Sequence, residues 1–427
     1  MRLLTIALQY PPAPVHCVGR YVFELNRALG GRAAVEPHVL RCGGDAGSAR
    51  SEEAGVTVHN ADCAIPARAL DWVGNVLLKN VPLAAKACEL AREYGPFDLI
   101  CAHDWPGAVA ARAVSCAFGV PMVFFIHHTE VARRGNQLTR AQLYVAELEA
   151  WIAERARAVV VPSSSVSEEV QSTYNVPRRR ITVIPCGVAT DTFTMDDDIS
   201  DFRAILADPD EAVVLYVGRL SPTKGADTLV EAMRVVGEQH PEAKLVVVGD
   251  GVLREELAKQ AEELGVATLF TGHLEGKALA AAYRCADVVV VPGRYEPTGM
   301  VALEAMACGK PVVASDVGGL REVIADGSGL RVPPSEPQPL AEAILRVLDD
   351  PPLAQTLGAA AQKQAGTYTW ESSAERLVSL ASRLLRSDRK GEGSTTSTSP
   401  ERNDPRPEAR DGQRQKGKER REDAQDR

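Results

Sequence analysis

The sequence predicts an α/β protein of two domains, and two observations carry that prediction. Apolar runs typical of strands alternate with helical patterns along the chain, which indicates βαβ units and parallel sheets. The 427 residues are 45% hydrophobic, which is enough for two α/β domains of ordinary size. We expect a first domain at residues 1–195, a linker at 196–209 and a second domain at 210–365. A helix at 366–386 and a disordered, charged tail at 387–427 would follow.

The first half contains two strand-to-helix segments with polar residues of interest. LLTIALQYPPAPVHCVGRYVFELNRALG predicts a buried strand, a Pro-rich loop and a helix that begins near Gly19. PMVFFIHHTE predicts a strand followed by His127 and His128. ARAVVVPSSSVSEEV predicts a strand and then a helix whose start carries a capping box of Ser165 with Glu168.

The second half places two cations after a predicted strand. VVLYVG reads as the strand, and the loop GRLSPTKG follows it with Arg219 and Lys224. Open α/β sheets bind ligands at the carboxyl ends of their strands. An arginine can grip a phosphate with a fork of donors, and a lysine adds a point charge. The segment therefore predicts an anion site.

A second strand-to-helix segment supports the same interpretation. ADVVVVPG is a β-branched run typical of a buried parallel strand. A helical pattern then runs from Gly299 to Cys308 and should end at Gly309. Unpaired N–H groups at a helix start favour an anion. Those N–H groups belong to Thr298, Gly299, Met300 and Val301.

Two carboxylates, Glu296 and Glu304, flank this helix start. Their spacing alone indicates little, because Glu255 and Glu263 repeat it in an ordinary amphipathic pattern. The setting differs, since Glu296 lies in a Pro/Gly loop between a buried strand and an apolar helix. The alternative for Glu304 is a carboxylate that merely complements the helix dipole.

The motifs GRLSPTKG, LVVVGDG, YEPTGMVALEAMACGKPVVASDVGG and GLRVPP occur in one order and spacing. In these motifs, over about residues 1–385, the chain resembles the retaining GT-B glycosyltransferases of glycosyltransferase family four. It is most similar to the bacterial and archaeal glycogen-synthase-like members. The resemblance implies a GT-B fold, in which two doubly wound Rossmann-like domains face each other across a cleft, and a last helix that returns to the first domain.

The resemblance also implies a reaction. A hexosyl group, glucosyl as the first expectation, would move with retention from a nucleotide-diphosphate sugar to a hydroxyl of a sugar or glycan acceptor. ADP-glucose or UDP-glucose is the first expected donor, and transfer of mannose from GDP-mannose is the alternative. Glucan, lipid-linked sugar and small metabolite all remain open as acceptors. An alternative of another class is a nucleotide-sugar-binding pseudoenzyme or regulatory module.

The family's site residues match this sequence position by position. Arg219 and Lys224 would hold the diphosphate and stabilise the leaving charge. Glu296 would bind the sugar's hydroxyls, Glu304 the ribose, and His127 would orient the sugar at the reacting centre. Backbone contacts to the donor are implied at Gly19, Leu274, Thr298, Gly299, Met300 and Val301. One departure stands out, because the family usually carries a Gly-Gly pair where this chain has His16 and Cys17.

Composition narrows the classes of function. The net charge of −9 disfavours a general nucleic-acid binder. No apolar run reaches the length of a membrane span, and the nine cysteines are scattered singly, so we expect a cytoplasmic protein with reduced thiols. No residues have metal-ligand spacing, so neither a metal nor another cofactor is predicted. Neither G-x-G-x-x-G after the first strand nor a P-loop is present, which disfavours a dehydrogenase and an NTPase. A homo-oligomer stays open.

Overall fold

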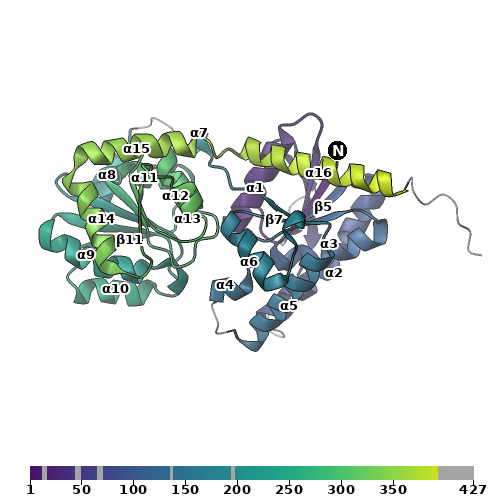
Figure 1. Ribbon diagram of the computed structural model, residues 1–427, viewed down its shortest axis with the longest axis horizontal. Helices are drawn as coiled ribbons and strands as arrows, with labels where there is room; N and C mark the ends of the chain where they lie inside the picture. Colours follow the sequence, from purple (N-terminus) through teal and green to yellow (C-terminus); the bar gives the residue numbers. More distant parts are fainter. Residues whose placement is uncertain (12–16, 44–49, 65–70, 135–137, 194–197, 393–427) are drawn as a thin grey trace, which may run out of the picture. The chain divides into compact units, whose positions relative to one another are not determined.

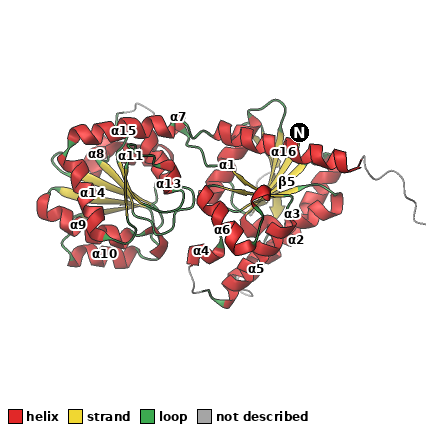
Figure 2. Cartoon of the chain, in the orientation of Figure 1, coloured by secondary structure: helices red, strands yellow, loops and turns green. Residues whose placement is uncertain are grey.

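A computed structural model describes residues 1–11, 17–43, 50–64, 71–134, 138–193 and 198–392 of the chain. Its internal contacts divide the chain into Met1–Leu385 and Arg386–Arg427, and the architecture below is that of the first unit. Most of the tail predicted at 387–427 lies outside the described residues. The first unit contains two separate sheets, each with helices packed on both faces (Figures 1 and 2).

The first sheet has eight strands in the order β3-β4-β2-β1-β5-β6-β7-β8. Its pairs are parallel except the β3–β4 pair, which is antiparallel. The strands are β1 (Arg2–Ala7), β2 (Glu36–Gly43), β3 (Arg50–Glu53), β4 (Val56–Asp62), β5 (Leu99–His103), β6 (Met122–Phe125), β7 (Ala158–Val161) and β8 (Ile181–Val183). The helices are α1 (Cys17–Gly30), α2 (Trp72–Glu93), α3 (Asp104–Phe118), α4 (Glu130–Arg134), α5 (Arg140–Arg155) and α6 (Ser164–Tyr174), with a 3₁₀ turn η1 (Arg178–Arg180).

The second sheet has six strands, all parallel, in the order β11-β10-β9-β12-β13-β14. They are β9 (Ala212–Val217), β10 (Ala243–Val248), β11 (Thr268–Gly272), β12 (Val288–Val291), β13 (Val312–Ser315) and β14 (Leu330–Val332). The helices around them are α9 (Ala226–Gln239), α10 (Arg254–Glu263), α11 (Gly276–Cys285), α12 (Met300–Ala307), α13 (Leu320–Val323), α14 (Pro337–Asp349) and α15 (Pro351–Ala365), with η2 (Pro222–Lys224). Strand order changes direction at β9, whose neighbours are β10 and β12.

The strands of both sheets are buried on two faces, which explains their continuous apolar sequence. In β9, for example, Val213 and Leu215 belong to one core cluster, and Val214 and Tyr216 belong to another. Helices α9 and α14 cover the second of these faces, and α11 and α12 cover the first. The period of two along the strand thus sends successive side chains into separate cores.

Short helices α7 (Thr190–Phe193) and α8 (Ser200–Leu206) follow the first sheet, and α16 (Trp370–Glu392) follows the second. The start of α16 contacts the chain just after β8. Ser373 Oγ donates to the Pro185 carbonyl over 2.7 Å, and the Val188 N–H donates to the Tyr368 carbonyl over 2.9 Å. Leu377 and Leu380 of α16 are buried. No helix in the described segments is long and apolar enough to cross a bilayer.

One local prediction was confirmed and another was wrong. Helix α1 starts at Cys17, near Gly19 as predicted, and Gly19 is buried in its first turn. The capping box of Ser165 with Glu168 does not form. Ser163 caps α6 instead, because its extended backbone lets Oγ accept from the Val166 N–H at 3.3 Å.

Candidate active site

The loop after β9 holds one paired cation and one unpaired cation. Lys224 Nζ lies 2.5 Å from Glu296 Oε1, and the carboxylate is largely buried. Burial alone would lower the pKa of Lys224, but Glu296 more than offsets it, and the pKa is raised. The exposed Arg219 has no carboxylate partner within the described part of the chain. Arg219 is therefore the cation most available to an anionic ligand.

The loop after β12 supplies the helix start that the sequence predicted. Gly299 is the residue before α12 and has a φ of +71°, a conformation that glycine adopts without strain. No side chain caps this end of the helix. The first N–H groups of α12, at Met300 and Val301, are left for a ligand, as an anion site requires. Thr298 lies just before them, partly buried.

Glu304, one turn into α12, uses both carboxylate oxygens. Arg20 Nη1 of α1 lies 2.9 Å from Oε1, and the Tyr283 hydroxyl of α11 donates to Oε2 over 2.8 Å. Glu304 is 4% exposed. Burial raises the pKa of this carboxyl, and Arg20 and Tyr283 counteract part of the shift. Neither Arg20 nor Tyr283 was singled out from the sequence.

The two histidines after β6 point in different directions. His127 is buried, with Nε2 3.0 Å from His103 Nδ1 and its ring 4.6 Å from that of Tyr21. Burial lowers the pKa of His127 to about 3. His128 remains partly exposed. Its pKa is lowered by burial and then by nearby positive charges, Arg219 and Lys224 among them. His128 is therefore the histidine within electrostatic reach of the cationic loop.

Asp104 and His103 join this group without having been predicted. The Asp104 carboxylate accepts the His127 N–H over 2.9 Å and lies 3.7 Å from His128 Nδ1. Asp104 has a φ of +51°, and burial raises its pKa to about 7. Left-handed backbone in a residue other than glycine often marks a functional site. The signal available in the sequence was the polar pair His103-Asp104 directly after the apolar run of β5.

A third contact group joins residues near both sheets. The Tyr295 hydroxyl, in the loop that carries Glu296, contacts Glu169 Oε1 of α6 at 3.1 Å. The same Glu169 oxygen accepts from the Thr129 N–H at 3.1 Å. Burial raises the pKa of Glu169, and the hydrogen bonds from Thr129 and Tyr295 oppose that rise. The loop after β12 and the residues after β6 therefore share one hydrogen-bonded carboxylate.

The remaining predicted contacts are less directly placed. Leu274 follows β11 and is partly buried against the core. His16 and Cys17 stand where the family usually has a Gly-Gly pair. His16 lies outside the described residues, whereas Cys17 is exposed at the start of α1. Cys17 is among the groups that raise the pKa of Lys224 and of Arg20. Cys17 thus lies within electrostatic reach of Lys224, one of the two predicted diphosphate cations.

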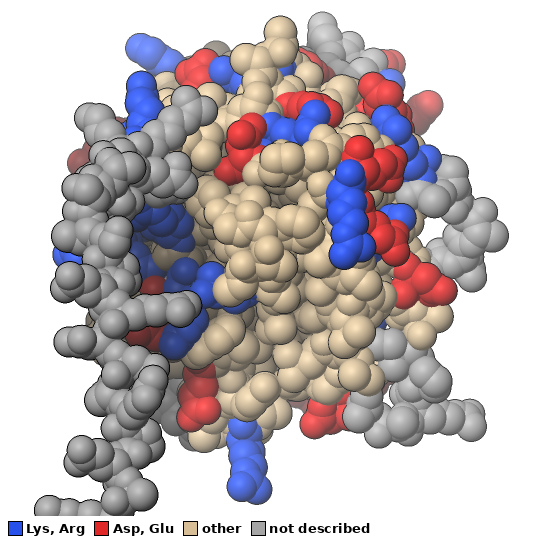
Figure 3. Space-filling model, turned by 90° about the vertical axis from the view of Figure 1, so that its right-hand side faces the viewer, with Lys and Arg blue, Asp and Glu red and all other residues tan. Residues whose placement is uncertain are grey.

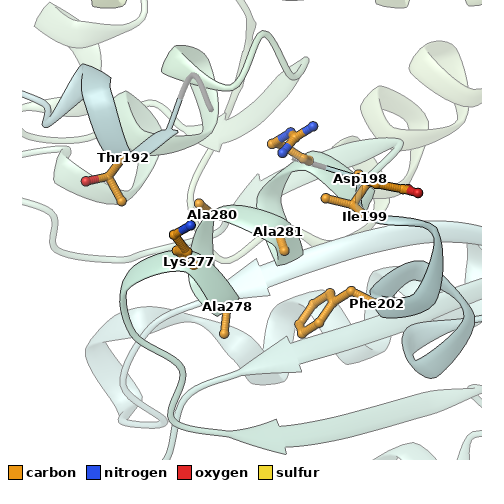
Figure 4. A pocket seen from close by; sticks show the side chains of 9 residues that line it. Thr192, Asp198, Ile199, Phe202, Lys277, Ala278, Ala280 and Ala281 are labelled. Atoms are coloured by element: carbon orange, nitrogen blue, oxygen red, sulfur yellow. The ribbon is translucent and has the colours of Figure 1, made fainter. Parts of the chain in front are cut away.

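A cavity of about 260 Å³ elsewhere in the unit holds none of these residues. It lies between α8 and α11 and is lined by Ile199, Phe202, Lys277 and several alanines (Figure 4). The polar groups, rather than this cavity, define the candidate site. In the described segments no cluster of three His, Cys, Asp or Glu side chains could hold a metal ion.

Comparison with known proteins decides the family. The profile described as "Glycosyltransferase Family 4" matches residues 18–192, and that described as "Glycosyl transferases group 1" matches residues 197–364. Glycogen synthase of Mycobacterium tuberculosis (strain ATCC 25618 / H37Rv) is 32% identical over 390 residues, which cover 87% of this chain and 92% of that protein. The chain belongs to glycosyltransferase family 4. The predicted resemblance is confirmed, and this family 4 member is a glycosyltransferase that acts on sugar nucleotides.

Other relatives and structures agree with this assignment. D-inositol 3-phosphate glycosyltransferase of Stackebrandtia nassauensis is 33% identical over 384 residues, which cover 84% of each chain. Sucrose-phosphate synthase from Thermosynechococcus elongatus superposes with a TM-score of 0.76 at 28% identity, over 90% of this chain and 99% of that one. WaaG, a lipopolysaccharide glycosyltransferase, shares the fold with a TM-score of 0.67 at 20% identity. The predicted GT-B fold, with its two Rossmann-like sheets, is therefore confirmed.

Proposed function

We propose that this family 4 glycosyltransferase moves a hexosyl group, glucosyl first, from a nucleotide-diphosphate sugar to a hydroxyl of a carbohydrate acceptor. The transfer would retain the anomeric configuration and need no metal. One observation carries the proposal. Arg219, Lys224, Glu296 and the start of α12 all follow the carboxyl ends of β9 and β12, which are neighbours in the second sheet. Ligands of open α/β sheets bind at such a point, where the strand order reverses.

The diphosphate would bind to fixed positive charge. Arg219 can donate two parallel hydrogen bonds to phosphate oxygens. Lys224 adds a charge that Glu296 holds in place at 2.5 Å. The N–H groups that begin α12 add donors that need no reorganisation as the glycosidic bond breaks. These groups would neutralise the leaving diphosphate without a cation, which is why metal independence belongs to the proposal.

The sugar would meet hydrogen-bonding groups from both sheets. Glu296 would accept from its hydroxyls, and His127 would orient it at the reacting centre. The low pKa of His127 keeps its imidazole neutral at physiological pH. Asp104 and His128 would complete this surface. The acceptor hydroxyl would approach the sugar on the same face that the leaving phosphate occupies. Glu304 would bind the ribose, and backbone groups at Gly19 and Leu274 the diphosphate and base.

The relatives' names support the choice of substrates. Glycogen is a glucose polymer, so the glycogen synthase relative favours a glucosyl donor, ADP-glucose or UDP-glucose. GDP-mannose is the alternative donor. The names D-inositol 3-phosphate glycosyltransferase and sucrose-phosphate synthase add a small phosphorylated acceptor to the glucan that glycogen implies. We assign the acceptor to a domain at 1–195 and the donor to one at 210–365, joined by 196–209 and braced by a helix at 366–386.

One experiment tests donor, configuration and metal together. Purified protein is incubated with ADP-glucose, UDP-glucose or GDP-mannose, with glycogen, glucose 1-phosphate or inositol phosphate as acceptor, in EDTA. Proton NMR of the product reports the anomeric configuration. The proposal expects one donor to give an α-linked product at a rate that EDTA does not change. A β-linked product, or activity that EDTA abolishes, would contradict it.

A pseudoenzyme that binds nucleotide sugars is the second candidate, and Cys17 favours it. Its side chain replaces a glycine within electrostatic reach of Lys224 and Arg20, where it would crowd a diphosphate. The variant carrying His16→Gly and Cys17→Gly discriminates the two candidates. Turnover in the double variant alone supports the pseudoenzyme, whereas turnover in the natural chain supports the transferase.

A further inference from the structure

Glu304 is assigned to the ribose in the proposed function, yet neither of its oxygens is free in the structure. Arg20 holds Oε1 at 2.9 Å, and Tyr283 holds Oε2 at 2.8 Å. A carboxylate has about four acceptor positions, so hydroxyl groups of a ligand must share or replace these contacts. The two partners differ in where they come from, and that difference suggests different roles.

Tyr283 and Glu304 lie on helices that pack against the same sheet, the second one. Tyr283 lies on α11, fully buried, and its ring packs edge-on against Phe193 at 5.8 Å between centroids. Helices α11 and α12 contact each other directly. A buried tyrosine in one fixed position can set the rotamer of the carboxylate it donates to. Its hydroxyl leaves Oε1 of Glu304 facing away, towards Arg20.

Arg20 reaches Glu304 from the other sheet. It lies on α1, in the helix that follows β1, and its side chain is 29% exposed. Glu304 is the largest influence on the Arg20 pKa, which it raises, and the guanidinium also lies over Phe193 at 5.6 Å. Because the Arg20 side chain is partly exposed, it can turn towards solvent when the ribose hydroxyls take its place on Oε1 and keep the buried carboxylate hydrogen-bonded.

We propose that Tyr283 positions Glu304 for the ribose hydroxyls and that Arg20 competes with those hydroxyls for Oε1. Arg20 therefore weakens nucleotide binding, whereas Tyr283 strengthens it. Binding of a nucleoside diphosphate exchanges the Arg20–Glu304 ion pair for hydrogen bonds from the ribose. The inference rests on the proposed nucleotide site, and it adds two residues with effects of opposite sign.

Calorimetric titration of the full chain separates the two effects. The probes are ADP, UDP, GDP and inorganic pyrophosphate, which lacks a ribose. The titrations are run at about pH 8, because burial raises the pKa of the Glu304 carboxyl and a higher pH favours its ionised form. For the nucleotide that binds most tightly, Arg20→Gln should lower Kd by about three- to tenfold. Tyr283→Phe should raise Kd by about three- to tenfold. Pyrophosphate Kd should not change in either variant.

Each variant has a matched control. Arg27→Gln removes another α1 arginine, one that pairs with Glu24 of its own helix at 2.8 Å. Tyr174→Phe removes another buried hydroxyl that donates to a buried carboxylate, Glu149. Neither control should change nucleotide Kd. Loss of folding alone would give both test variants weaker binding to every probe, so the opposite signs are the signature of the proposal.

The outcomes distinguish this inference from the proposed function. If Arg20→Gln weakens binding of both the nucleotide and pyrophosphate, Arg20 contacts the diphosphate and the inference is overturned. Unchanged nucleotide Kd in Arg20→Gln, or tighter binding in Tyr283→Phe, overturns it as well. In all three cases nucleotide binding still persists, so the proposed function stands. If no nucleotide binds the natural chain, both the proposed site and the inference fail.

Discussion

The loops at the carboxyl ends of the two sheets hold their polar groups in different ways. On the second sheet, charged side chains from neighbouring loops meet in pairs, as Lys224 and Glu296 do at 2.5 Å, and Arg219 stays exposed. On the first sheet, His103, His127 and Asp104 pack against one another in a buried cluster. The second sheet presents fixed charge, which suits a diphosphate. The first presents buried hydrogen-bonding groups, which suit the hydroxyls of a sugar.

The largest expected effect tests the charged side of this comparison. Lys224→Ala removes a cation from the leaving diphosphate and leaves Glu296 buried without its partner. We expect kcat/KM to fall by about 100- to 1000-fold, as for other preorganised electrostatic groups. Lys244→Ala is the matched control, because Lys244 pairs with Glu211 at 3.0 Å at a similar exposure. Steady-state kinetics, with the donor that the activity assay identifies, measures kcat/KM for both variants. Equal losses in the two variants would show that Lys224 acts only through folding.

Backbone packing beside Lys224 gives the next largest effect. Gly225 has a φ of +67°, and a Cβ there would lie 2.0 Å from the Pro292 carbonyl oxygen. Gly265 has a φ of +66° with nothing within 4 Å of a Cβ. Gly225→Ala should cost at least about 3 kcal/mol of unfolding free energy, from strain and overlap together. Gly265→Ala should cost only about 1–2 kcal/mol, from strain alone. Urea unfolding measures both, and similar costs would refute the close approach at Gly225.

Acid should destabilise the first sheet through its histidines. His38 Nδ1 lies 3.0 Å from His59 Nε2, and burial, followed by the charge of His38, lowers the pKa of His59 to about 4. Its stabilising contribution is present above the unfolded pKa of about 6.5 and is lost as pH falls towards 4. Asp104 and Glu149 act in the opposite sense. Burial raises the pKa of Asp104 to about 7 and that of Glu149 to about 8. The stability that these two groups contribute is therefore lost as pH rises through those values.

Thermal unfolding between pH 7 and pH 4 checks this dependence. The midpoint should fall over that range, and His59→Gln should make the fall shallower by removing one proton uptake. His240→Gln is the control. His240 is a partly exposed histidine whose pKa is raised by its hydrogen bonds to Asp349 and Glu242, so its linkage has the opposite sign. A midpoint in His59→Gln that falls as steeply as in the natural chain would contradict the assignment.

The smallest effect concerns a buried hydrogen bond of the first sheet. Tyr174 donates to Glu149 Oε2, which also accepts from the Glu130 N–H at 3.0 Å. Tyr174→Phe leaves that carboxyl with one donor fewer, and we expect a loss of about 1–3 kcal/mol in unfolding free energy. Tyr144→Phe changes an exposed side chain and should have no measurable effect. Equal stability of Tyr174→Phe and the natural chain would mean that water replaces the hydroxyl.

The same contrast explains what the sequence could predict. Charged residues of the second sheet lie in loops whose ends are set by local patterns. Gly309, for example, was predicted to end the helix, and it has a left-handed φ of +69° just after the C-cap residue Cys308 of α12. Ser163, Ser164 and Ser165 look equivalent in the sequence. The cap falls on Ser163 because its backbone is extended, whereas Ser164 already begins α6.

Long-range contacts could not be predicted in this way. His103 ends β5 and His127 follows β6, and their contact depends on these strands being neighbours in the sheet. Arg20 meets Glu304 only because two sheets of one unit come together. Each residue looks ordinary in its own segment, an arginine on a helix and a histidine after a strand. The partners of the predicted Glu304, rather than Glu304 itself, are what the fold adds.

Calorimetric titration with ADP, UDP and GDP, applied to the natural chain and to Glu304→Gln, tests the central claim most directly. The claim is that the loops after β9 and β12 form a nucleotide-sugar site. It predicts that one nucleotide binds to the natural chain. Glu304→Gln keeps the shape of the side chain but removes its charge, so it should weaken binding of that nucleotide and leave binding of pyrophosphate unchanged. Binding of no nucleotide, or equal binding to the variant, would contradict the site and the function proposed from it.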